Sequence, residues 1–490
     1  MAVHADVFDE GGAVINVKAE GFGARGNGVD DDWEPIQRAL LAARKASDYP
    51  REGTQGAIVF FPPGIYLVSR PINCTVRQSN LVGSGPYQTV IRGRTGAGRA
   101  VIDMSGASYS TVRDLMIDDG DPAAPRPAGA SEVGILCSRV IGLERSREMA
   151  DADEPAEAAA APPAEPAHAP SLAQVNLHNV NVRLRSSLGG ARPDDRTNRG
   201  SVGVYNFGVE EVNYHNVHLR ADTPLVICAT NVFGLDSPYA FLPQRQQSMS
   251  VVNVTGQSSL VSQGRNALRL HGGAHANVDA FLAFEGPPAR AQHAILCTAS
   301  WRDLRWNGSM EGFPTLLRVE NAYLVGADLQ GYALYTSGTE MVSLAGNAHL
   351  MGGTLRITPA EATDPRTDGV LLRTHGGADQ YVQNLLLYLY ENRIDSPNPQ
   401  ARFRGNVVMS LRSLAELRAR VRVVGENAGN LLMGHDMASA YGVALAGAGP
   451  DAGRPPAASV GAGAMYYSTS RRMPLWSDGS AWRTASGESA

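Results

Sequence analysis

The first apolar pattern in the chain follows the three- and four-residue spacing of one helix face, carried by Ile36, Ala39, Leu40 and Ala43. Pro35 falls in the first turn of this expected helix, where a missing N–H costs little. The next apolar runs lie in AIVFFPPGIYLVSRP, residues 57–71, and surround a Pro-Pro-Gly turn. The pattern therefore predicts a short helix followed by two strands.

Further along the chain, short apolar runs alternate with polar turns. Two pairs of similar segments, which we call echoes, indicate the spacing of these runs. LRLHGGA at 268–274 returns as LRTHGGA at 372–378, an offset of 104 in the numbering. FEGP at 284–287 and MEGFP at 310–314 place Glu285 and Glu311 at an offset of 26. Because 104 is four times 26, both echoes fit one rung length. Strand-and-turn repeats of this size are typical of a β-solenoid.

Composition agrees with a large all-β repeat fold. The 490 residues include 53 Gly, a content that suits many tight turns, and 43% hydrophobic residues, which excludes global disorder. The formal net charge of -5 argues against nucleic acid as the main partner, because phosphate neutralisation requires a basic face. Neither a signal peptide nor a transmembrane span is visible, so we expect a chain made in the cytoplasm with no membrane insertion.

The cysteines indicate neither a zinc site nor a disulfide framework. They are widely scattered, form no Cys-x-x-Cys pair and lie in apolar, strand-like runs. We therefore expect buried free thiols at Cys74, Cys137, Cys228 and Cys297.

The segments FGARGNGVDDDWEPIQRAL (22–40) and FFPPGIYLVSRPI (60–72) resemble the opening motif of the pectate-lyase-like superfamily. The resemblance implies an all-β fold, a single-stranded right-handed parallel β-helix, with the N-terminal helix capping the end of the solenoid. It also implies that Asp30, Asp31 and Asp32 are turn and helix-cap residues. The paired-Asp motif followed by Gly-His-Gly of the superfamily's hydrolases does not occur in this sequence.

The end of the chain resembles a different group. MYYSTSRRMPLWSDGSAWR, residues 465–483, predicts a small β-hairpin region with a turn at Asp478-Gly479. Its rhythm of aromatic residues is similar to the C-termini of phage and prophage structural proteins. Spikes of such particles are commonly trimers, so the resemblance implies a homotrimer that joins other particle structural proteins through one terminus.

These observations predict the following domain organisation. An N-terminal arm covers residues 1–15, and the parallel β-helix domain covers 16–445. Within this domain, an Ala-, Pro- and Glu-rich stretch at about 145–170 has the composition of a mobile insertion. A linker follows at 446–463, and a small C-terminal module covers 464–490.

Glu285 and Glu311 are the catalytic candidates. Equivalent positions of successive rungs stack roughly 4.8 Å apart, so a rung equal to their offset would place the two carboxyl groups side by side. That separation suits the acid and nucleophile of a retaining glycosidase. The alternative is that Glu-Gly is only a repeated corner of the solenoid.

Trp301, Asp303 and Arg305 are the candidate carbohydrate-binding residues. Strand alternation would direct all three outward and Leu304 into the core. An aromatic ring stacks on the C–H face of a sugar, while a carboxylate and a guanidinium take its hydroxyl groups. The alternative is a solvated strand with an Asp–Arg pair.

Two further clusters have simpler interpretations. Asp118, Asp119 and Asp121 offer the oxygen ligands that calcium prefers, but a polar turn is the favoured interpretation. His271 and His375 both precede Gly-Gly at equivalent repeat positions and are interpreted as turn residues. We therefore expect no metal and no cofactor.

Together, the motifs favour a spike or fibre protein at the surface of a virion or phage-like particle. Its expected partner is bacterial capsular or exopolysaccharide, with depolymerisation left open. The alternative is a stand-alone carbohydrate-active enzyme, either a polysaccharide lyase or a glycoside hydrolase. A purely structural solenoid would explain the fold but would leave the predicted outward trio without a role.

Overall fold

The computed structural model describes residues 14–46, 57–74, 79–96, 99–121, 124, 126–138, 140–141, 167–168, 174–188, 200–209, 211–228, 251–334, 340–359, 369–390, 392–434 and 445–490. The predicted insertion at 145–170 lies almost entirely outside these ranges, as does most of the predicted N-terminal arm. Among the described residues, no helix is both long enough and apolar enough to cross a membrane.

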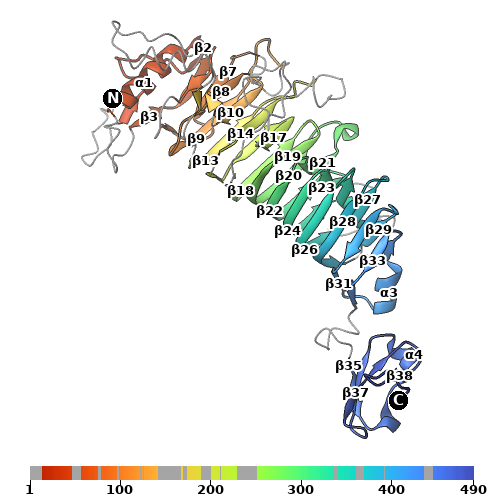
Figure 1. Cartoon of the computed structure of the whole chain (residues 1–490). Helices are drawn as coiled ribbons and strands as arrows, with labels where there is room; N and C mark the ends of the chain where they lie inside the picture. The colour runs from red at the N-terminus through yellow and green to blue at the C-terminus, as the bar shows by residue number, and fades with distance from the viewer. Residues whose placement is uncertain are drawn as a thin grey trace.

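The strands coil into a right-handed parallel β-helix, as the opening motif implied (Figure 1). The first sheet contains β1 (Val14–Asn16), β2 (Asn27–Asp31), β3 (Ile58–Phe61), β4 (Gly64–Val68), β6 (Asn80–Gly83), β7 (Thr89–Gly93), β9 (Ser110–Asp118), β13 (Val175–Arg183), β15 (Glu211–His215), β16 (His218–Ala221), β18 (Val251–Ser262), β20 (Gly273–Phe284), β22 (Trp301–Glu311), β24 (Tyr323–Leu334), β26 (His349–Pro359), β28 (Gln380–Leu389), β30 (Ala401–Arg404), β31 (Val407–Ser410), β33 (Glu426–Ala428) and β34 (Leu431–Met433).

The second sheet runs beside the first along the solenoid. It contains β5 (Ile72–Asn73), β8 (Ala100–Asp103), β10 (Val133–Ser138), β14 (Val202–Phe207), β17 (Thr223–Cys228), β19 (Asn266–His271), β21 (His293–Cys297), β23 (Thr315–Glu320), β25 (Glu340–Ala345), β27 (Val370–His375), β29 (Arg393–Ser396) and β32 (Val421–Val423). A separate pair, β11 (Val140–Ile141) and β12 (Ala167–His168), is antiparallel.

An aliphatic column through the second sheet explains why the rungs stay in register. One inward position on every strand of this sheet carries an aliphatic side chain: Ile72, Ile102, Ile135, Val204, Leu225, Leu268, Ile295, Leu317, Val342, Leu372, Ile394 and Val421. All but the last are buried. Since a one-residue slip would turn each of these side chains outward, their burial fixes the register of the sheet.

The first leucine of each repeated segment, LRLHGGA and LRTHGGA, belongs to this column. Leu268 and Leu372 occupy the same inward position four rungs apart, so the interpretation of their offset as four rungs is confirmed. The individual rungs are not uniform, however. Between these two leucines the column passes through Ile295, Leu317 and Val342, which divide the chain into steps of unequal length. The register is therefore set by the inward side chains rather than by a constant repeat length.

Helix α1 (Trp33–Ala46) covers the N-terminal end of the solenoid and packs on β1, β3, β4 and β5. Its predicted apolar face is buried: Ile36 and Ala39 are inaccessible to solvent, and Leu40 and Ala43 nearly so.

The aspartates before this helix have the turn and cap roles that the resemblance implied. Asp31 accepts a hydrogen bond from the backbone N–H of Trp33, at 3.1 Å. Asp32 is buried and accepts hydrogen bonds from the N–H groups of Arg25 and Gly26. Asp30 is half-buried and accepts a hydrogen bond from the side chain of Asn27. The prediction for this segment is thus confirmed.

The long strands of the first sheet bend at residues with a left-handed backbone. On the N-terminal rungs these residues are Asp114, Asn179, Asn216 and Gly256, which we call the N-terminal bend column. Strand β13, for example, pairs with β15 before its bend and with β16 after it. From β20 onward the left-handed residues form the C-terminal bend column: His275, Asp303, Gly326, Gly352, Asn384, Gly405 and Gly429.

The two bend columns do not continue into each other. Between β18 and β20 the register shifts, with Val254 paired to Val278 and Ser258 paired to Ala280. Three residues of β18 therefore lie opposite one residue of β20, Asp279. The bend of β18 lies within this shift, whereas β20 bends earlier, at His275. The strand segments after the bend are consequently longer on β20, β22, β24 and β26, and they give these rungs a wider outer surface.

The predicted C-terminal hairpin is present within a separate four-stranded sheet. Strand β36 (Met465–Ser468) pairs antiparallel with β37 (Met473–Ser477), which pairs antiparallel with β38 (Trp482–Arg483) across the Asp478-Gly479 turn. The stretch predicted as a linker contributes β35 (Leu445–Gly449), parallel to β36, and the short helix α4 (Ala457–Val460). Helix α3 (Leu414–Ala419) lies near the C-terminal end of the solenoid and begins with a capping box at Ser413.

All four cysteines are buried free thiols, as predicted. Burial raises the pKa of Cys297 to about 12, so this thiol remains protonated at neutral pH.

Candidate functional site

The widest described outer surface of the solenoid lies on the strand segments that follow the C-terminal bend column. We call it the long-strand face and define it as the outward side chains within 276–284, 304–311, 327–333, 353–358 and 385–390. Side chains alternate between core and surface in these segments. Outward residues on adjacent strands therefore form columns that run along the solenoid axis.

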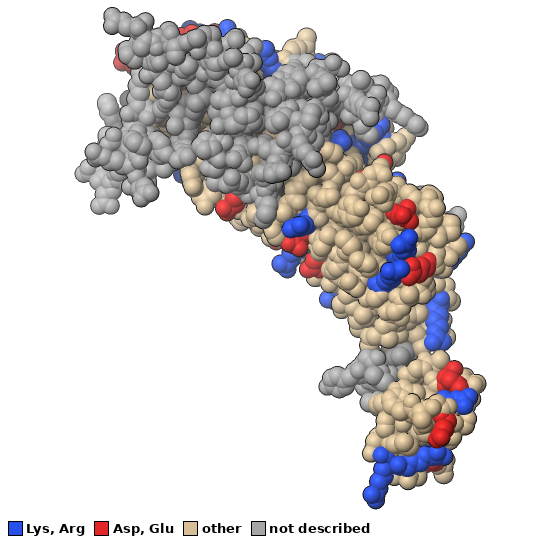
Figure 2. Space-filling view, in the orientation of Figure 1, with Lys and Arg blue, Asp and Glu red and all other residues tan. Residues whose placement is uncertain are grey.

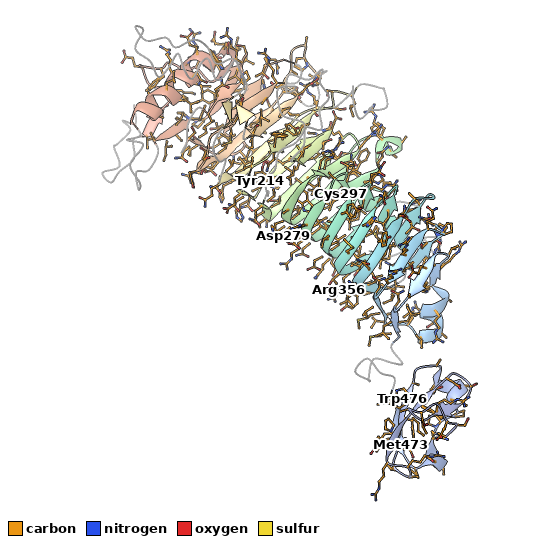
Figure 3. The ribbon with its side chains drawn as sticks, viewed as in Figure 1. Tyr214, Asp279, Cys297, Arg356, Met473 and Trp476 are labelled. Carbon is orange, nitrogen blue, oxygen red and sulfur yellow. The ribbon has the colours of Figure 1, made fainter. Side chains whose placement is uncertain are left out.

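One central column of the long-strand face is polar throughout. Register pairs Asp279 with Asn307, Asn307 with Gln330, and Gln330 with Arg356. The next column, towards the bend, contains Asn277, Arg305, Asp328 and Thr354 in the same order. Figure 3 places the labelled Asp279 and Arg356 along the same side of the solenoid. With strands about 4.8 Å apart, these columns present hydrogen-bonding groups at regular steps.

Charges of both signs are interspersed on this surface. Most of its charged side chains form no ion pair with the described residues. Figure 2 shows red and blue side chains next to each other along the edge that carries β20 to β26 in Figure 1. Neither Arg305 nor Arg356 has an ion pair with any described carboxylate, and within the same part of the chain neither Asp279 nor Glu311 pairs with a cation. Asp328 accepts a hydrogen bond from Gln330, at 3.2 Å. The charged groups of this face remain available to a ligand.

Tyrosines surround Arg356 at the C-terminal end of the face. Arg356 Nε donates a hydrogen bond to the hydroxyl of Tyr390, at 2.9 Å. Its guanidinium carbon lies 5.7 Å from the centre of the Tyr388 ring. Tyr332 is 60% exposed and lies on the neighbouring strand, two residues beyond the Gln330 that pairs with Arg356. An exposed ring beside a positioned guanidinium suits a ligand with both an apolar face and polar groups.

The geometry suits an extended, hydroxyl-rich ligand. Regular columns of carboxylate, amide and guanidinium groups donate and accept hydrogen bonds along the axis, while tyrosine rings supply stacking surfaces. Within the described part of the chain, no group of three or more His, Cys, Asp or Glu side chains is arranged to hold a metal ion.

The predicted stacking of Glu285 on Glu311 is wrong in register. Glu311 pairs with Ala283, because the rung from β20 to β22 is two residues longer than the offset between the glutamates. Glu285 lies past the end of β20 and forms an ion pair with Arg220 at 2.9 Å. Glu311 is exposed on the long-strand face. The catalytic roles of the two residues stay predictions.

The predicted outward direction of Trp301 is also wrong, since only 1% of this side chain is exposed. The cause is the left-handed backbone of Asp303, which places two successive residues, Arg302 and Asp303, on the surface and resets the alternation. Leu304 is buried, as predicted, and Arg305 is exposed on the long-strand face.

Asp303 lies at the edge of this face rather than within it. It belongs to the C-terminal bend column, where one carboxylate oxygen is 2.9 Å from His275 Nδ1. Of the three predicted carbohydrate-binding residues, the structure therefore places Arg305 on the long-strand face, Asp303 beside it and Trp301 in the core.

The acidic cluster at 118–121 is embedded in arginines. Arg92 donates two hydrogen bonds of 2.8 Å to the carboxylate of Asp118. Asp119 is 1% exposed and pairs with Arg185 at 3.0 Å and with Arg126 at 3.3 Å. These contacts hold the turn after β9 in place and agree with its interpretation as a polar turn.

His271 and His375 are the last residues of β19 and β27, at the equivalent positions predicted from the echo. His271 Nδ1 lies 2.7 Å from the Thr298 hydroxyl, and burial lowers the pKa of His271 to about 4. His375 Nε2 lies 2.7 Å from Glu340. Burial raises the pKa of Glu340, but the hydrogen bonds from His375 and Arg373 outweigh it and leave that pKa below its usual value.

The sequence reasoning missed the tyrosines and Arg356. A signal was present in NLLLYLY, residues 384–390, where inward leucines alternate with outward Leu386, Tyr388 and Tyr390. The same alternation runs through Tyr332 and Arg356. These positions meet on one surface only through the register of β24, β26 and β28, which the sequence pattern did not define.

A protein-family model matches the N-terminal part of the chain. Residues 14–118 match the family model described as rhamnogalacturonase A/epimerase, pectate lyase-like. The resemblance of the opening motif to this superfamily is therefore confirmed over that segment. A probable glucan endo-1,3-beta-glucosidase of Arthroderma benhamiae is 33% identical over 128 residues, which cover 23% of this chain. The chain matches only 14% of that protein's length.

Solved structures with a similar course of the chain include the A-module of the mannuronan C-5 epimerase AlgE6 of Azotobacter vinelandii. It is 16% identical with a TM-score of 0.37, and the match covers 85% of this chain and 98% of the module. The enzymatically active domain of tailspike protein 2 of bacteriophage CBA120 is 10% identical with a TM-score of 0.44. That match covers 76% of this chain and 48% of the tailspike domain.

Proposed function

We propose that this chain is a spike or fibre protein of a phage or phage-derived particle and binds bacterial capsular or exopolysaccharide through its long-strand face. The observation that carries the proposal is the set of regular outward columns in which Asp279, Arg305 and Arg356 lack ion-pair partners among the described residues. Sugar polymers are recognised by such groups together with exposed rings like that of Tyr332.

The proposed assembly is a homotrimer on the particle surface. The aromatic rhythm of residues 465–483 supports the particle role, and one terminus of the chain would join other structural proteins of the particle. Light scattering checks the assembly. A mass of about three times 51.9 kDa is expected, whereas a mass near 51.9 kDa would contradict the trimer.

The second candidate is a stand-alone carbohydrate-active enzyme, either a lyase or a glycoside hydrolase. It is favoured by the family model matched at residues 14–118, whose description names a rhamnogalacturonase and an epimerase. Glu311 is the better acid–base candidate, since it is exposed and has no ion pair with a described cation, whereas Glu285 is engaged with Arg220.

The experiment incubates the purified protein with capsular and exopolysaccharides from candidate host bacteria. Polymer size, new reducing ends, unsaturated-uronate absorbance and retention of polymer are measured on the same samples. Retention that is lost in Tyr332→Ala and kept in Arg422→Gln, an exposed residue of the second sheet, is the expected result. If no polysaccharide is retained, the binding function is wrong.

The same samples separate binding from cleavage. Shortened chains that disappear in Glu311→Gln but persist in Glu285→Gln would make the protein a depolymerase with one essential carboxylate. New absorbance would identify a lyase. Retention without shortening would identify an adhesin.

A further inference from the structure

We infer that the C-terminal end of the long-strand face is a carboxylate subsite, in which Arg356, Tyr332 and Tyr390 recognise an acidic sugar that recurs at intervals along an otherwise neutral polysaccharide. The inference rests on the proposed function and specifies the ligand class of the same surface.

Arg356 is a cation with nearly all of its donors free. A guanidinium carries five N–H donors, and Arg356 uses one of them, the Nε–H bonded to Tyr390. Its side chain is exposed, and it has no ion pair with a described carboxylate. Other arginines of the C-terminal rungs differ: Arg373, Arg402 and Arg404 each pair with an Asp or Glu. The two terminal NH₂ groups of Arg356 therefore face solvent as a fork that matches a carboxylate.

The fork is held in a defined orientation. The hydrogen bond to Tyr390 fixes the Nε edge of the guanidinium, and the Tyr388 ring lies 5.7 Å from its central carbon. Both tyrosines come from β28 and its first following residue, whereas Arg356 comes from β26. Because two contacts from a neighbouring rung position the side chain, little conformational freedom is lost when a ligand binds.

Tyr332 adds the second element of a sugar site. Its side chain is 60% exposed, and its residue pairs with Thr358, two residues beyond Arg356 on the same strand face. Outward positions two residues apart lie roughly 7 Å from each other along a strand. A pyranose ring stacked on Tyr332 thus lies within reach of Arg356 through its carboxylate.

The charges of the face favour a polymer in which carboxylates are spaced apart along the chain. The described outward positions carry three carboxylates, Asp279, Glu311 and Asp328, and two guanidiniums, Arg305 and Arg356. A polymer with a carboxylate on every sugar would bring anions against these acidic residues, which is unfavourable. A polymer with acidic sugars separated by neutral ones can place its carboxylates on the arginines and its hydroxyl groups on the acids.

The test uses purified bacterial polysaccharides immobilised in matched pairs, one native and one with its uronic carboxyl groups reduced to hydroxymethyl groups. The panel contains neutral polymers, polymers with one uronate per repeat unit, polygalacturonate, and polymers that are acidic through phosphate alone. Wild-type protein is expected to be retained best by native polymers with one uronate per repeat. Carboxyl reduction should weaken that binding by about tenfold to a hundredfold.

Variants assign the effect to the subsite. Arg356→Gln should raise the dissociation constant for the native polymer by about tenfold to a hundredfold and leave the reduced polymer unchanged. The dissociation constant of Arg356→Lys should lie between those of wild type and Arg356→Gln, because lysine keeps the charge but lacks the planar fork. Tyr390→Phe should weaken binding less than Arg356→Gln. Arg422→Gln, which removes the same charge from the second sheet, is the control and should bind as wild type.

Three outcomes would overturn the inference. If neutral or carboxyl-reduced polymers bind as tightly as native ones and Tyr332→Ala still abolishes retention, the binding face stands and the carboxylate subsite is wrong. Tightest binding to phosphate polymers or to polygalacturonate would overturn the ligand class. If no polymer is retained, the proposed function fails and the subsite fails with it.

Discussion

The turn after β9 and the long-strand face use their charged residues differently. Around the turn after β9, Asp118 and Asp119 are buried among arginines from three parts of the chain. On the long-strand face, Asp279, Arg305 and Arg356 are solvent-accessible and form no ion pair with described residues. The charged groups at the turn after β9 therefore stabilise the fold, whereas those of the long-strand face remain available to a ligand.

The N-terminal and C-terminal bend columns also differ in how many side-chain contacts support them. In the N-terminal bend column, the side chain of Asn179 donates a hydrogen bond to Asp114, at 2.8 Å, and Asn216 accepts one from the N–H of Gln257. The C-terminal bend column is mostly glycine, which adopts the left-handed backbone without strain. Side-chain hydrogen bonds support the first set of bends, whereas four of the seven bends in the second set need no side chain because they are glycines.

The largest expected effect is the loss of the buried carboxylate in the first region. Asp119→Ala should lower the free energy of unfolding by about 3–5 kcal/mol, because it leaves Arg185 and Arg126 without their buried partner. Urea unfolding followed by circular dichroism measures the change. Asp279→Ala on the long-strand face is the matched control and should stay within about 0.5 kcal/mol of wild type. Equal effects of the two substitutions would remove the distinction between the regions.

The next effect depends on pH and concerns the second sheet, which runs beside the long-strand face. Burial, assisted by Arg318, lowers the pKa of His293 to about 4. The unfolded chain therefore binds a proton at this residue before the folded chain does. The resulting stability is fully present above about pH 6.5 and is lost as the pH falls towards 4, by about 2–3 kcal/mol in total. The unfolding free energy of His293→Asn, measured by urea unfolding at a series of pH values, should fall less than that of wild type over this range. Equal falls in the two proteins would contradict the role of His293.

The smallest effect probes the glycine bends. Gly326 has a φ of 75°, and an added Cβ would lie 2.5 Å from the Asp303 carboxylate. Gly326→Ala should cost about 1–2 kcal/mol of unfolding free energy, because alanine is strained in the left-handed region. Gly377→Ala, where an added Cβ meets nothing within 4 Å, is the control. Thermal unfolding of both variants measures the difference, and equal midpoints would show that the bend tolerates a side chain.

The solenoid was predictable from the sequence because inward positions repeat with the rungs. The echo at Leu268 and Leu372 succeeded for this reason, since both leucines occupy one buried column. The helix cap was equally accessible, because the spacing of Ile36 and its apolar neighbours is local along the chain. Local periodicity and buried repeats are therefore the features that a single sequence reveals.

The site was less predictable because it depends on register between rungs of unequal length. Glu285 and Glu311 do not stack, because the rung that joins their strands is two residues longer than their offset in the sequence. Trp301 was misplaced by one left-handed residue, Asp303, which resets the alternation. The proximity of Tyr332 and Arg356 follows from strand pairing and has no signature in either segment alone.

The aliphatic column of the second sheet has a consequence for how such chains diverge. Val204 and Leu225 follow each other closely along the chain, whereas a far longer stretch separates Ile135 from Val204, and both steps keep the column in phase. Since each rung requires only its neighbours, residues can be inserted or deleted at a corner without adjustment of distant rungs. Recombination at corners can therefore change the exterior of the molecule, and with it the surfaces that the protein recognises, while the interior is inherited intact.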